Sequence, residues 1–322
     1  MSLLKIEGVS KSYDSKSNAI ETTNLTINRN ERTALVGATG SGKSTLLKLM
    51  AGLEQPDTGD VYFENERIEG PEEKLIPGHA SIAYLPQDYR LPNYTRVEEY
   101  LLNSDYEDDE VDLVYNACNI HHLLNSFTQH LSGGEKQRVA LAKQIMGKPE
   151  ILLLDEPFSS LDHQHKEIIK SVLEEIEQQL DTTIVLVAHE PVDVLSWANT
   201  IIVMKQGAIV QKGTPHTLYR TPKDEYVAGL FGHYNLTSIN KWSIPGSIKL
   251  TKIENRVLLR PEDFSIGKIG SSDHYGSVTN IKYMGNYYLT ELEFDNERIL
   301  VKSDSDNYQI NDRIGVNLSI RV

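Results

Sequence analysis

The feature that most constrains this chain is a glycine-rich stretch, GATGSGKST at residues 37–45. It follows a short apolar, β-rich run (TALV, 33–36) and precedes a run with helical character (LLKLMA, 46–51). Gly37, Gly42, Lys43 and Ser44 fill the G-x-x-x-x-G-K-S/T pattern. Glycines let the backbone curl so that its N–H groups point inward at a phosphate, and the helix N-terminus adds positive potential. The stretch therefore predicts a nucleotide-binding loop in an α/β domain, in preference to an ordinary glycine turn.

A second stretch supplies the acids that such a loop needs. The run ILLLDEP (151–157) is apolar until it closes with Asp155 and Glu156, as is typical of a central parallel strand. Ligands collect at the carboxyl ends of strands in an open α/β sheet. Beside a loop where Lys43 reaches the β- and γ-phosphates and Ser44 ligates magnesium, Asp155 is a candidate magnesium ligand and Glu156 a candidate water-orienting base. Without the loop, two acids at this place would be an ordinary strand terminus.

Two single residues are candidates for a functional role, but each could equally be an ordinary structural residue. His189 ends the apolar run TIVLVA (183–188), where a lone histidine is more often structural than functional. Tyr13 lies between two alternating stretches, 3–9 and 19–27, which predict half-exposed antiparallel strands. An aromatic ring ahead of a phosphate loop can stack on adenine, but an isolated tyrosine is usually just a strand residue.

The stretch LSGGEKQR (131–138) contains a feature that helix capping does not explain. Ser132 is a plausible N-cap, with Glu135 three residues later as its capping-box partner. Gly133 and Gly134, in the first helical turn, each cost about 1 kcal/mol relative to alanine. We expect that a ligand or another chain approaches the backbone there, where the helix offers free N–H groups.

Composition excludes several classes of protein. A length of 322 residues suits two domains, and the formal net charge of -14 argues against indiscriminate binding to nucleic acid or anionic lipid. The single cysteine, Cys118, cannot form an internal disulfide, which agrees with a reducing compartment. No apolar run approaches the roughly 18 residues that span a bilayer, so we expect any membrane role to act through a partner.

The remaining sequence predicts further elements of an α/β domain and then a change of class. We expect a hairpin at 57–70, a strand at 81–85, and mostly helix at 96–127, with an acidic cluster (105–112) that suits a solvated helix start better than a metal site. Past Thr214 the chain is predicted to become helical again to about residue 231, and the domain boundary is predicted at 233–241. The short alternating strands beyond it are typical of a small β-barrel or sandwich.

Taken in order, these stretches resemble the ATPase subunits of ATP-binding cassette (ABC) transporters along essentially the whole chain. Residues 37–45 match the Walker A loop, Gln87 the Q-loop glutamine, and residues 131–137 the signature sequence. Residues 151–157 match Walker B, 159–162 the D-loop, and His189 the switch histidine. Six motifs in the right order are far more specific than one. They support a functional role for Tyr13 and His189 more strongly than the sequence next to either residue does.

The resemblance implies a site shared between two copies of the chain. In this family two subunits face each other head to tail, and each ATP lies between one Walker A loop and the other subunit's signature loop. Glu156 would then polarise the attacking water, His189 would hold the γ-phosphate, and Gln87 would contact the water or Mg²⁺. The implied nucleotide contacts are Tyr13, Gly37, Ala38, Thr39, Gly40, Ser41, Gly42, Lys43, Ser44, Thr45, Ser132, Gly133, Gly134 and Asp162. The implied metal ligands are Ser44, Gln87 and Asp155.

The tail resembles the accessory β-domain of importer ATPases for maltose, polyamines, sulfate, molybdate and ferric iron. The expected architecture is a P-loop ABC ATPase domain at 1–235, with a helical subdomain at about 88–146, and a TOBE-like, all-β barrel at 242–322. This implies a homodimeric ATPase on the cytoplasmic face of the inner membrane, attached to permease subunits and served by an extracytoplasmic solute-binding protein. The implied solute is ferric iron, a polyamine or sulfate. Two departures from the family pattern, Glu135-Lys136 and Glu190, remove no catalytic group.

Two other functions remain open at this point. The first is an ABC ATPase that acts on ribosomes or nucleic acid; such proteins usually carry two cassettes, coiled coils or zinc insertions, and none is visible in this sequence. The second is an exporter ATPase, against which the β-rich tail argues.

Overall fold

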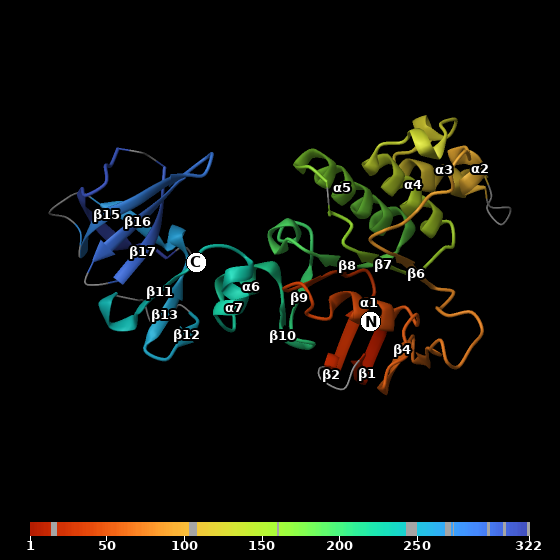
Figure 1. Cartoon of the computed structure of the whole chain (residues 1–322), viewed down its shortest axis with the longest axis horizontal. Helices are drawn as coiled ribbons and strands as arrows, with labels where there is room; N and C mark the ends of the chain where they lie inside the picture. The colour runs from red at the N-terminus through yellow and green to blue at the C-terminus, as the bar shows by residue number, and fades with distance from the viewer. Residues whose placement is uncertain are drawn as a thin grey trace. The chain divides into compact units, whose positions relative to one another are not determined.

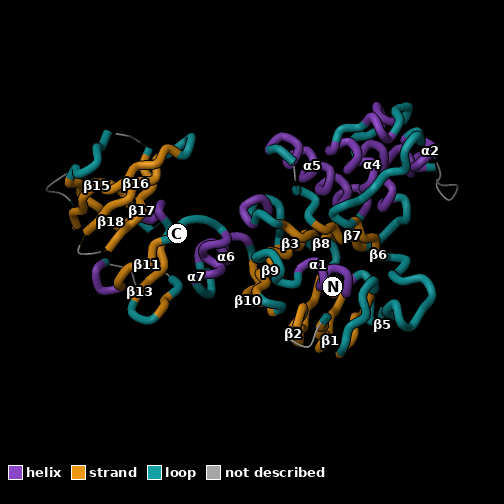
Figure 2. The backbone as a smooth tube through the Cα atoms, viewed as in Figure 1, coloured by secondary structure: helices purple, strands orange, loops and turns teal. Residues whose placement is uncertain are grey.

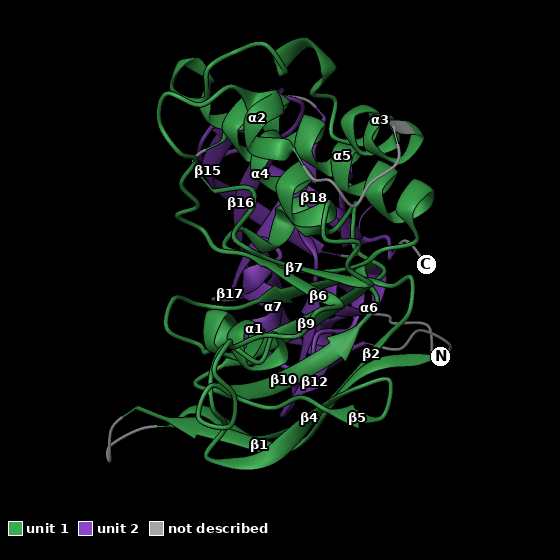
Figure 3. Cartoon of the chain, turned by 90° about the vertical axis from the view of Figure 1, so that its right-hand side faces the viewer, with its two compact units in different colours: residues 1–215 green, residues 216–322 purple. Residues whose placement is uncertain are grey.

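The structure is a computed structural model that describes residues 1–13, 18–102, 108–159, 161–242, 250–267, 272, 274–294, 297–304 and 307–320. The chain divides into two compact units, Met1–Pro215 and His216–Val322 (Figure 3). The first unit is α/β and the second is mainly β, as the sequence predicts.

The central sheet of the first unit has the strand order β10-β9-β3-β8-β7-β6 within the described residues. All neighbours pair in parallel except β10, which pairs antiparallel with β9. The strands are β3 (Arg32–Val36), β6 (Ile82–Leu85), β7 (Ile151–Asp155), β8 (Thr183–Ala188), β9 (Thr200–Lys205) and β10 (Ala208–Gly213). Every residue of β7 and β8 is buried, which confirms the two strands predicted from their apolar runs. Because these strands are parallel, the residues that follow β3, β6, β7 and β8 meet at one edge of the sheet.

A second, antiparallel sheet lies on one side of the central sheet (Figure 1). Its strands, in spatial order, are β2 (Asn18–Asn28), β1 (Ser2–Ser12), β4 (Thr58–Phe63) and β5 (Glu66–Arg67). The predicted hairpin at 57–70 is confirmed as β4 and β5, joined through Glu64 and Asn65 with positive φ. Helix α1 (Lys43–Met50) lies between the two sheets, and one hydrophobic core joins all three, including Ile6, Leu47 and Val187. This core fixes the base of the phosphate loop.

Helices cover the opposite face of the central sheet (Figure 2). They are α2 (Val97–Leu101), α3 (Asp108–Ala117), α4 (Gly133–Ile145) and α5 (His163–Leu180). The mostly helical stretch predicted at 96–127 is divided into α2, α3 and the 3₁₀ turn η1 (His121–Leu123). Of the predicted acidic cluster, residues 105–107 lie outside the described residues, and Asp109 and Asp112 belong to α3. No helix in the described part of the chain combines the length and the apolarity that a membrane span requires.

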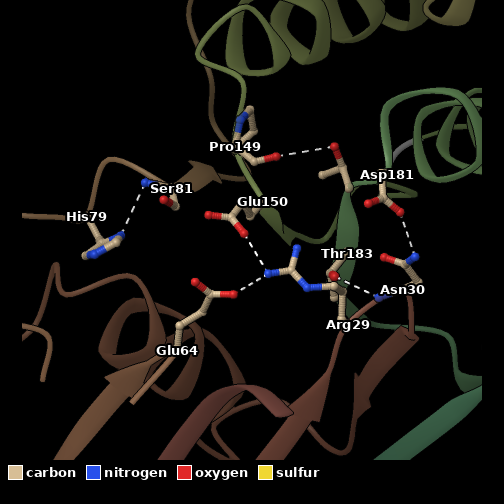
Figure 4. Close-up of polar contacts among 10 residues, drawn as sticks. Arg29, Asn30, Glu64, His79, Ser81, Pro149, Glu150, Asp181 and Thr183 are labelled. Atoms are coloured by element: carbon tan, nitrogen blue, oxygen red, sulfur yellow. Dashed lines mark hydrogen bonds and ion pairs between the residues drawn. The ribbon is translucent and has the colours of Figure 1, made fainter. Parts of the chain in front are cut away.

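An arginine ties the two sheets together at the amino ends of the central strands (Figure 4). The Arg29 guanidinium donates hydrogen bonds to Glu64, in the β4–β5 turn, and to Glu150, which precedes β7 (2.7 Å). Next to it, the Asn30 backbone N–H donates to the Thr183 hydroxyl (3.0 Å) and the Asn30 side chain to Asp181 (2.6 Å). These contacts fix the end of the sheet opposite to the phosphate loop.

The second unit contains two antiparallel sheets around one core. In the described residues their orders are β11-β13-β12 and β14-β18-β15-β16-β17. The strands are β11 (Asn235–Ser238), β12 (Lys252–Ile253), β13 (Arg256–Leu259), β14 (Phe264–Gly267), β15 (His274–Tyr283), β16 (Tyr288–Phe294), β17 (Glu297–Ser303) and β18 (Arg313–Leu318). The edge strands β14 and β17 contact each other, so the larger sheet curls towards closure as a barrel does. The side chain of Asn235 exchanges two hydrogen bonds with the backbone of Leu300 (2.8 and 2.7 Å) and so joins β11 to β17.

The boundary between the units lies earlier than the sequence predicts. Helices α6 (Pro215–Arg220) and α7 (Glu225–Leu230) precede the predicted boundary at 233–241, yet residues from 216 onward group with the second unit. The physical reason is Arg260, which is 1% exposed and donates to the backbone carbonyls of Tyr219, Ala228, Gly232 and His233. A single buried side chain thus anchors residues 219–233 to the β-rich unit.

Candidate nucleotide site

The glycine-rich loop connects β3 to α1, as predicted, and two of its glycines leave no room for a side chain. Gly37 has φ 151°, and a Cβ on it would lie 2.2 Å from the Met204 carbonyl oxygen. Gly42 has φ 98°, is the N-cap of α1, and would place a Cβ 2.3 Å from the Ala19 carbonyl oxygen. Any larger residue at these two positions would displace the backbone. Ala38, Thr39 and Gly40 are exposed at the tip of the loop.

Lys43 places a cation at the centre of this loop. Its Nζ donates to the carbonyls of Gly37 (2.9 Å) and Ala38 (3.0 Å) and approaches the Ser41 hydroxyl at 3.5 Å. The residue is only 6% exposed. Burial lowers the pKa of the Lys43 ammonium, and the nearby carboxylates of Glu156 and Asp155 act in the opposite direction. The loop therefore encloses a positive charge that an anionic phosphate group can neutralise.

Ser44 and Asp155 meet beside the loop. The Ser44 hydroxyl donates to Asp155 Oδ1 (2.9 Å), and the Tyr84 hydroxyl, from β6, donates to Asp155 Oδ2 (3.2 Å). Burial and the neighbouring Asp155 raise the pKa of Tyr84 well above its ordinary value, so this phenol stays protonated. Hydroxyl and carboxylate oxygens are the ligands that Mg²⁺ prefers, and Mg²⁺ usually takes one or two carboxylates plus phosphate oxygens. This pair fits such a site, although no group of three or more His, Cys, Asp or Glu side chains in the described ranges could hold a metal.

Gln87 and Glu156 are also brought together at this edge. The Gln87 side-chain amide donates to Glu156 Oε2 (3.0 Å). Glu156 has a left-handed backbone (φ 52°), and its carbonyl accepts hydrogen bonds from the backbone N–H and the hydroxyl of Ser159 (3.1 and 2.9 Å). A residue other than glycine in this conformation stores local strain that the surrounding contacts must hold. Gln87, Gly133 and Glu156 line one cavity of about 350 Å³.

His189 follows the end of β8 on the other side of Glu156. It is exposed, and its imidazole has no hydrogen-bond partner among the described residues. His189 and Glu156 line a second cavity of about 420 Å³, together with Lys166, Glu190 and Asp193. The carboxyl ends of β7 and β8 therefore present a carboxylate and an imidazole to one space.

The glycines of residues 131–138 lie at an open helix end. Ser132 caps α4: its hydroxyl accepts from the Glu135 N–H (3.3 Å), and Glu135 accepts from the Ser132 N–H (2.8 Å). This confirms the predicted capping box. A Cβ on Gly133 would meet nothing within 4 Å, whereas one on Gly134 would approach the His165 ring at 3.0 Å. The first-turn amides of a helix have no intrahelical acceptor, so this end can receive an anion from outside.

Some predicted residues are not joined to the loop within this chain. No hydrogen bond links Ser132 or Tyr13 to residues 37–45 in the described part of the structure. Tyr13 follows β1; the residue is 62% exposed, and Lys11 Nζ lies 5.7 Å from its ring centroid. Asp162 caps α5 by accepting from the N–H and the ring of His165 (2.9 and 2.8 Å), while Ser160 lies outside the described residues.

Four residues of the site were not predicted from the sequence. Tyr84 donates to Asp155, and the Tyr89 hydroxyl donates to the Gly133 carbonyl (3.3 Å). His165 lies between Asp162 and Gly134, and Lys166 binds the segment after His189. No local pattern in the sequence marks these residues, because each contact joins segments that are far apart along the chain or depends on side-chain direction.

Comparison with known proteins agrees with this geometry. The family model "ABC transporter" matches residues 20–159, and the model "TOBE domain" matches residues 257–321. The glucose import ATP-binding protein GlcV of Saccharolobus solfataricus is 33% identical over 93% of this chain and 92% of its own length. The spermidine/putrescine import ATP-binding protein PotA of Salmonella typhimurium is 31% identical over 95% and 87%. The Fe(3+) ions import ATP-binding protein FbpC of Vibrio cholerae is 29% identical over 88% and 86%.

Solved structures show the same fold. The cbiO1 protein of Clostridium perfringens, part of the ABC transporter complex cbiONQ, superimposes with a TM-score of 0.60 at 30% identity, over 68% of this chain and 90% of its own. The ATP-binding cassette MJ0796, a dimer bound to ADP and Pi, gives a TM-score of 0.56 at 25% identity, over 66% and 99%. The chain therefore belongs to the ABC transporter family, as an ATP-hydrolysing subunit of the importer type with a C-terminal TOBE domain.

Proposed function

We propose that two copies of this chain pair head to tail and hydrolyse ATP at sites that neither copy completes alone. The observation that carries this proposal is the open N-terminus of α4. Gly133 and Gly134 offer first-turn backbone amides there, and in the described residues no hydrogen bond joins them or Ser132 to the phosphate loop of the same chain. The MJ0796 cassette, which is dimeric with ADP and Pi bound, supports the pairing of two copies.

In the proposed dimer each ATP is held from both sides. The amides of residues 37–45 and the Lys43 ammonium bind the β- and γ-phosphates, because several N–H dipoles and one cation converge on the same point. Tyr13 stacks on the adenine ring with its exposed face. Ser132 of the second copy binds the γ-phosphate with its hydroxyl, Gly133 and Gly134 bind it with their first-turn amides, and Asp162 connects the two sites.

We propose that Mg²⁺ binds with the nucleotide at Ser44 and Asp155, with Gln87 beside them. When bound, the ion neutralises charge on the β- and γ-phosphate oxygens. Tyr84 fixes the Asp155 carboxylate through its hydrogen bond and so keeps the other carboxylate oxygen directed at Ser44.

Glu156 and His189 carry the remaining steps. Glu156 accepts a hydrogen bond from Gln87 in this structure. When Gln87 releases the Glu156 carboxylate, the carboxylate can accept a hydrogen bond from a water molecule and orient that water towards the γ-phosphorus. His189 donates to a γ-phosphate oxygen from the other side. Phosphoryl transfer depends mostly on positioning and on charge neutralisation, and this set of groups supplies both.

We further propose that the dimer binds two permease subunits at the cytoplasmic face of the inner membrane and drives uptake of a solute delivered by an extracytoplasmic binding protein. The named relatives serve glucose, spermidine and putrescine, and Fe(3+). Since the ATPase subunit does not contact the solute, the permease and the binding protein set the specificity of uptake.

The variant Glu156→Gln tests the proposal. It keeps the size of the side chain but removes the carboxylate, so ATP binding should persist while turnover falls by about 10²-fold or more. The ATP-bound form should then accumulate as a dimer in light scattering. Glu167→Gln, which alters an exposed carboxylate on α5 that pairs with Lys170, is the matched control and should behave like the parent. Wild-type turnover in Glu156→Gln would remove Glu156 from the assigned role, and an ATP-bound monomer would contradict the dimeric site.

A further inference from the structure

A partly buried lysine binds the segment that follows His189. Lys166, in the first turn of α5, donates to Asp193 Oδ2 (2.7 Å) and to Glu190 Oε2 (3.1 Å). Its side chain is 16% exposed and that of Asp193 is 20% exposed. The hydrogen bond that Lys166 donates to Asp193 raises the pKa of the lysine, so it stays charged. An ion pair this shielded is screened far less by salt than one on the open surface.

This ion pair forms part of the wall of the cavity that His189 shares with Glu156. The His189 imidazole has no partner of its own among the described residues, so its position depends on the backbone on either side. On one side that backbone is β8, which is fixed in the central sheet. On the other side it is Glu190 and the 3₁₀ turn η3 (Pro191–Val194), and Lys166 binds both Glu190 and Asp193 of this segment.

Lys166 lies where three predicted motif segments meet: the D-loop (159–162), the signature sequence (131–137) and the segment around His189. Asp162 caps the helix from which Lys166 extends, and the preceding residue, His165, packs against Gly134 at the start of α4. The helix start therefore carries a fixed cation that faces the His189 segment. Glu190, the residue directly after His189, is one of the two carboxylates that this lysine binds.

We propose that Lys166 is a positioning residue for His189, which holds residues 190–193 so that the imidazole faces the γ-phosphate. The lysine does not contact the nucleotide in this account; it acts through the Glu190 and Asp193 carboxylates. The inference depends on the role proposed above for His189. It also gives the glutamate at position 190 a physical function.

The test compares Lys166→Met, Lys166→Arg and Lys170→Met in the full-length chain. Methionine keeps the apolar length of lysine but cannot pair with either carboxylate. We expect Lys166→Met to lower kcat by about 10- to 100-fold, the scale of a small misplacement of a catalytic group, with ATP affinity within about twofold of the parent. Lys166→Arg, which can still bind both carboxylates, should restore most of kcat. Lys170→Met removes a lysine and its pair with Glu167 from the same helix and should leave kcat unchanged.

A double variant distinguishes an effect of Lys166 on the position of His189 from a general loss of stability. If Lys166 acts through His189, Lys166→Met should cause no further loss of kcat in a His189→Ala background. An equal loss in both backgrounds, or a Lys166→Met variant that matches Lys170→Met, would overturn the inference. If His189→Ala alone turns over like the parent, the role proposed for His189 fails instead, and the two failures are thereby distinguished.

Discussion

The buried arginine of the second unit offers a demanding test of the structure. Arg260 Nε and Nη2 donate to the Tyr219 carbonyl (3.1 and 3.0 Å). Nη1 donates to the carbonyls of Ala228 (3.1 Å), Gly232 (3.2 Å) and His233 (3.0 Å). The guanidinium also lies 4.1 Å from the centroid of the Tyr219 ring. Arg260→Met keeps much of the apolar stem and removes every one of these donors.

The expected cost follows from the acceptors left behind. Each buried carbonyl that loses its donor costs about 1–3 kcal/mol, and those that regain water cost less. A buried charge is costly to desolvate, and burial accordingly lowers the pKa of Arg260, so removing the charge offsets part of the loss. We expect the unfolding free energy of the second unit to fall by about 3–5 kcal/mol. In urea this lowers the midpoint by roughly 2 M, for a slope near 2 kcal/mol/M.

The two tryptophans of the chain allow the unfolding of each unit to be measured separately. Trp197 belongs to the first unit, and Trp242 lies in the core of the second, with its ring 5.0 Å from that of Phe264. In a Trp197→Phe background, the fluorescence of Trp242 reports the unfolding of the second unit alone. Arg256→Met, which changes an exposed arginine on β13, is the control and should stay within about 0.5 kcal/mol. A loss below about 1 kcal/mol for Arg260→Met would refute the anchoring role.

Two further predictions concern the first unit. Cys118 is fully buried, and burial raises the pKa of its thiol from 9.0 to about 12, so a thiol reagent should label it only after unfolding. Because the folded pKa is the higher one, this thiol should favour the fold below about pH 9 and lose that contribution as pH rises towards 12; rapid labelling of the native chain would contradict the burial. Gly42→Ala, which combines φ 98° with a 2.3 Å clash, should weaken ATP binding more than Gly40→Ala, where φ is 77° and nothing lies within 4 Å. Equal affinities in a titration would contradict the steric account of the loop.

Local patterns in the sequence predicted the elements of the first unit well. The apolar runs of β7 and β8, the hairpin of β4 and β5, and the capping box of α4 each depend on neighbouring residues, and the structure confirms them. The boundary between the units was placed too late because it depends on Arg260, which binds carbonyls about 30 to 40 residues earlier in the chain. No composition change near residue 216 marks such a contact.

In the candidate site, too, some residues could be predicted from local sequence patterns and others could not. Motif order identified Lys43, Ser44 and Asp155, and the structure brings them to one edge of the sheet because parallel strands end there. Tyr84 and Lys166 were missed, since their roles depend on which side chains face Asp155 and Asp193 after folding. The functions of the predicted residues remain predictions that the variants described above can test.

The central claim is that each ATP site is built from two chains, and mixing two inactive variants tests it most directly. Lys43→Ala disables the phosphate loop. Gly133→Asp places a negative charge at the open end of α4, where it suits the helix and where its Cβ has open space around it. Random pairing gives about half mixed dimers, each with one intact site, so the mixture should recover roughly one quarter of the parent ATPase rate. A mixture no more active than either variant alone, or full activity of Gly133→Asp by itself, would contradict the shared site.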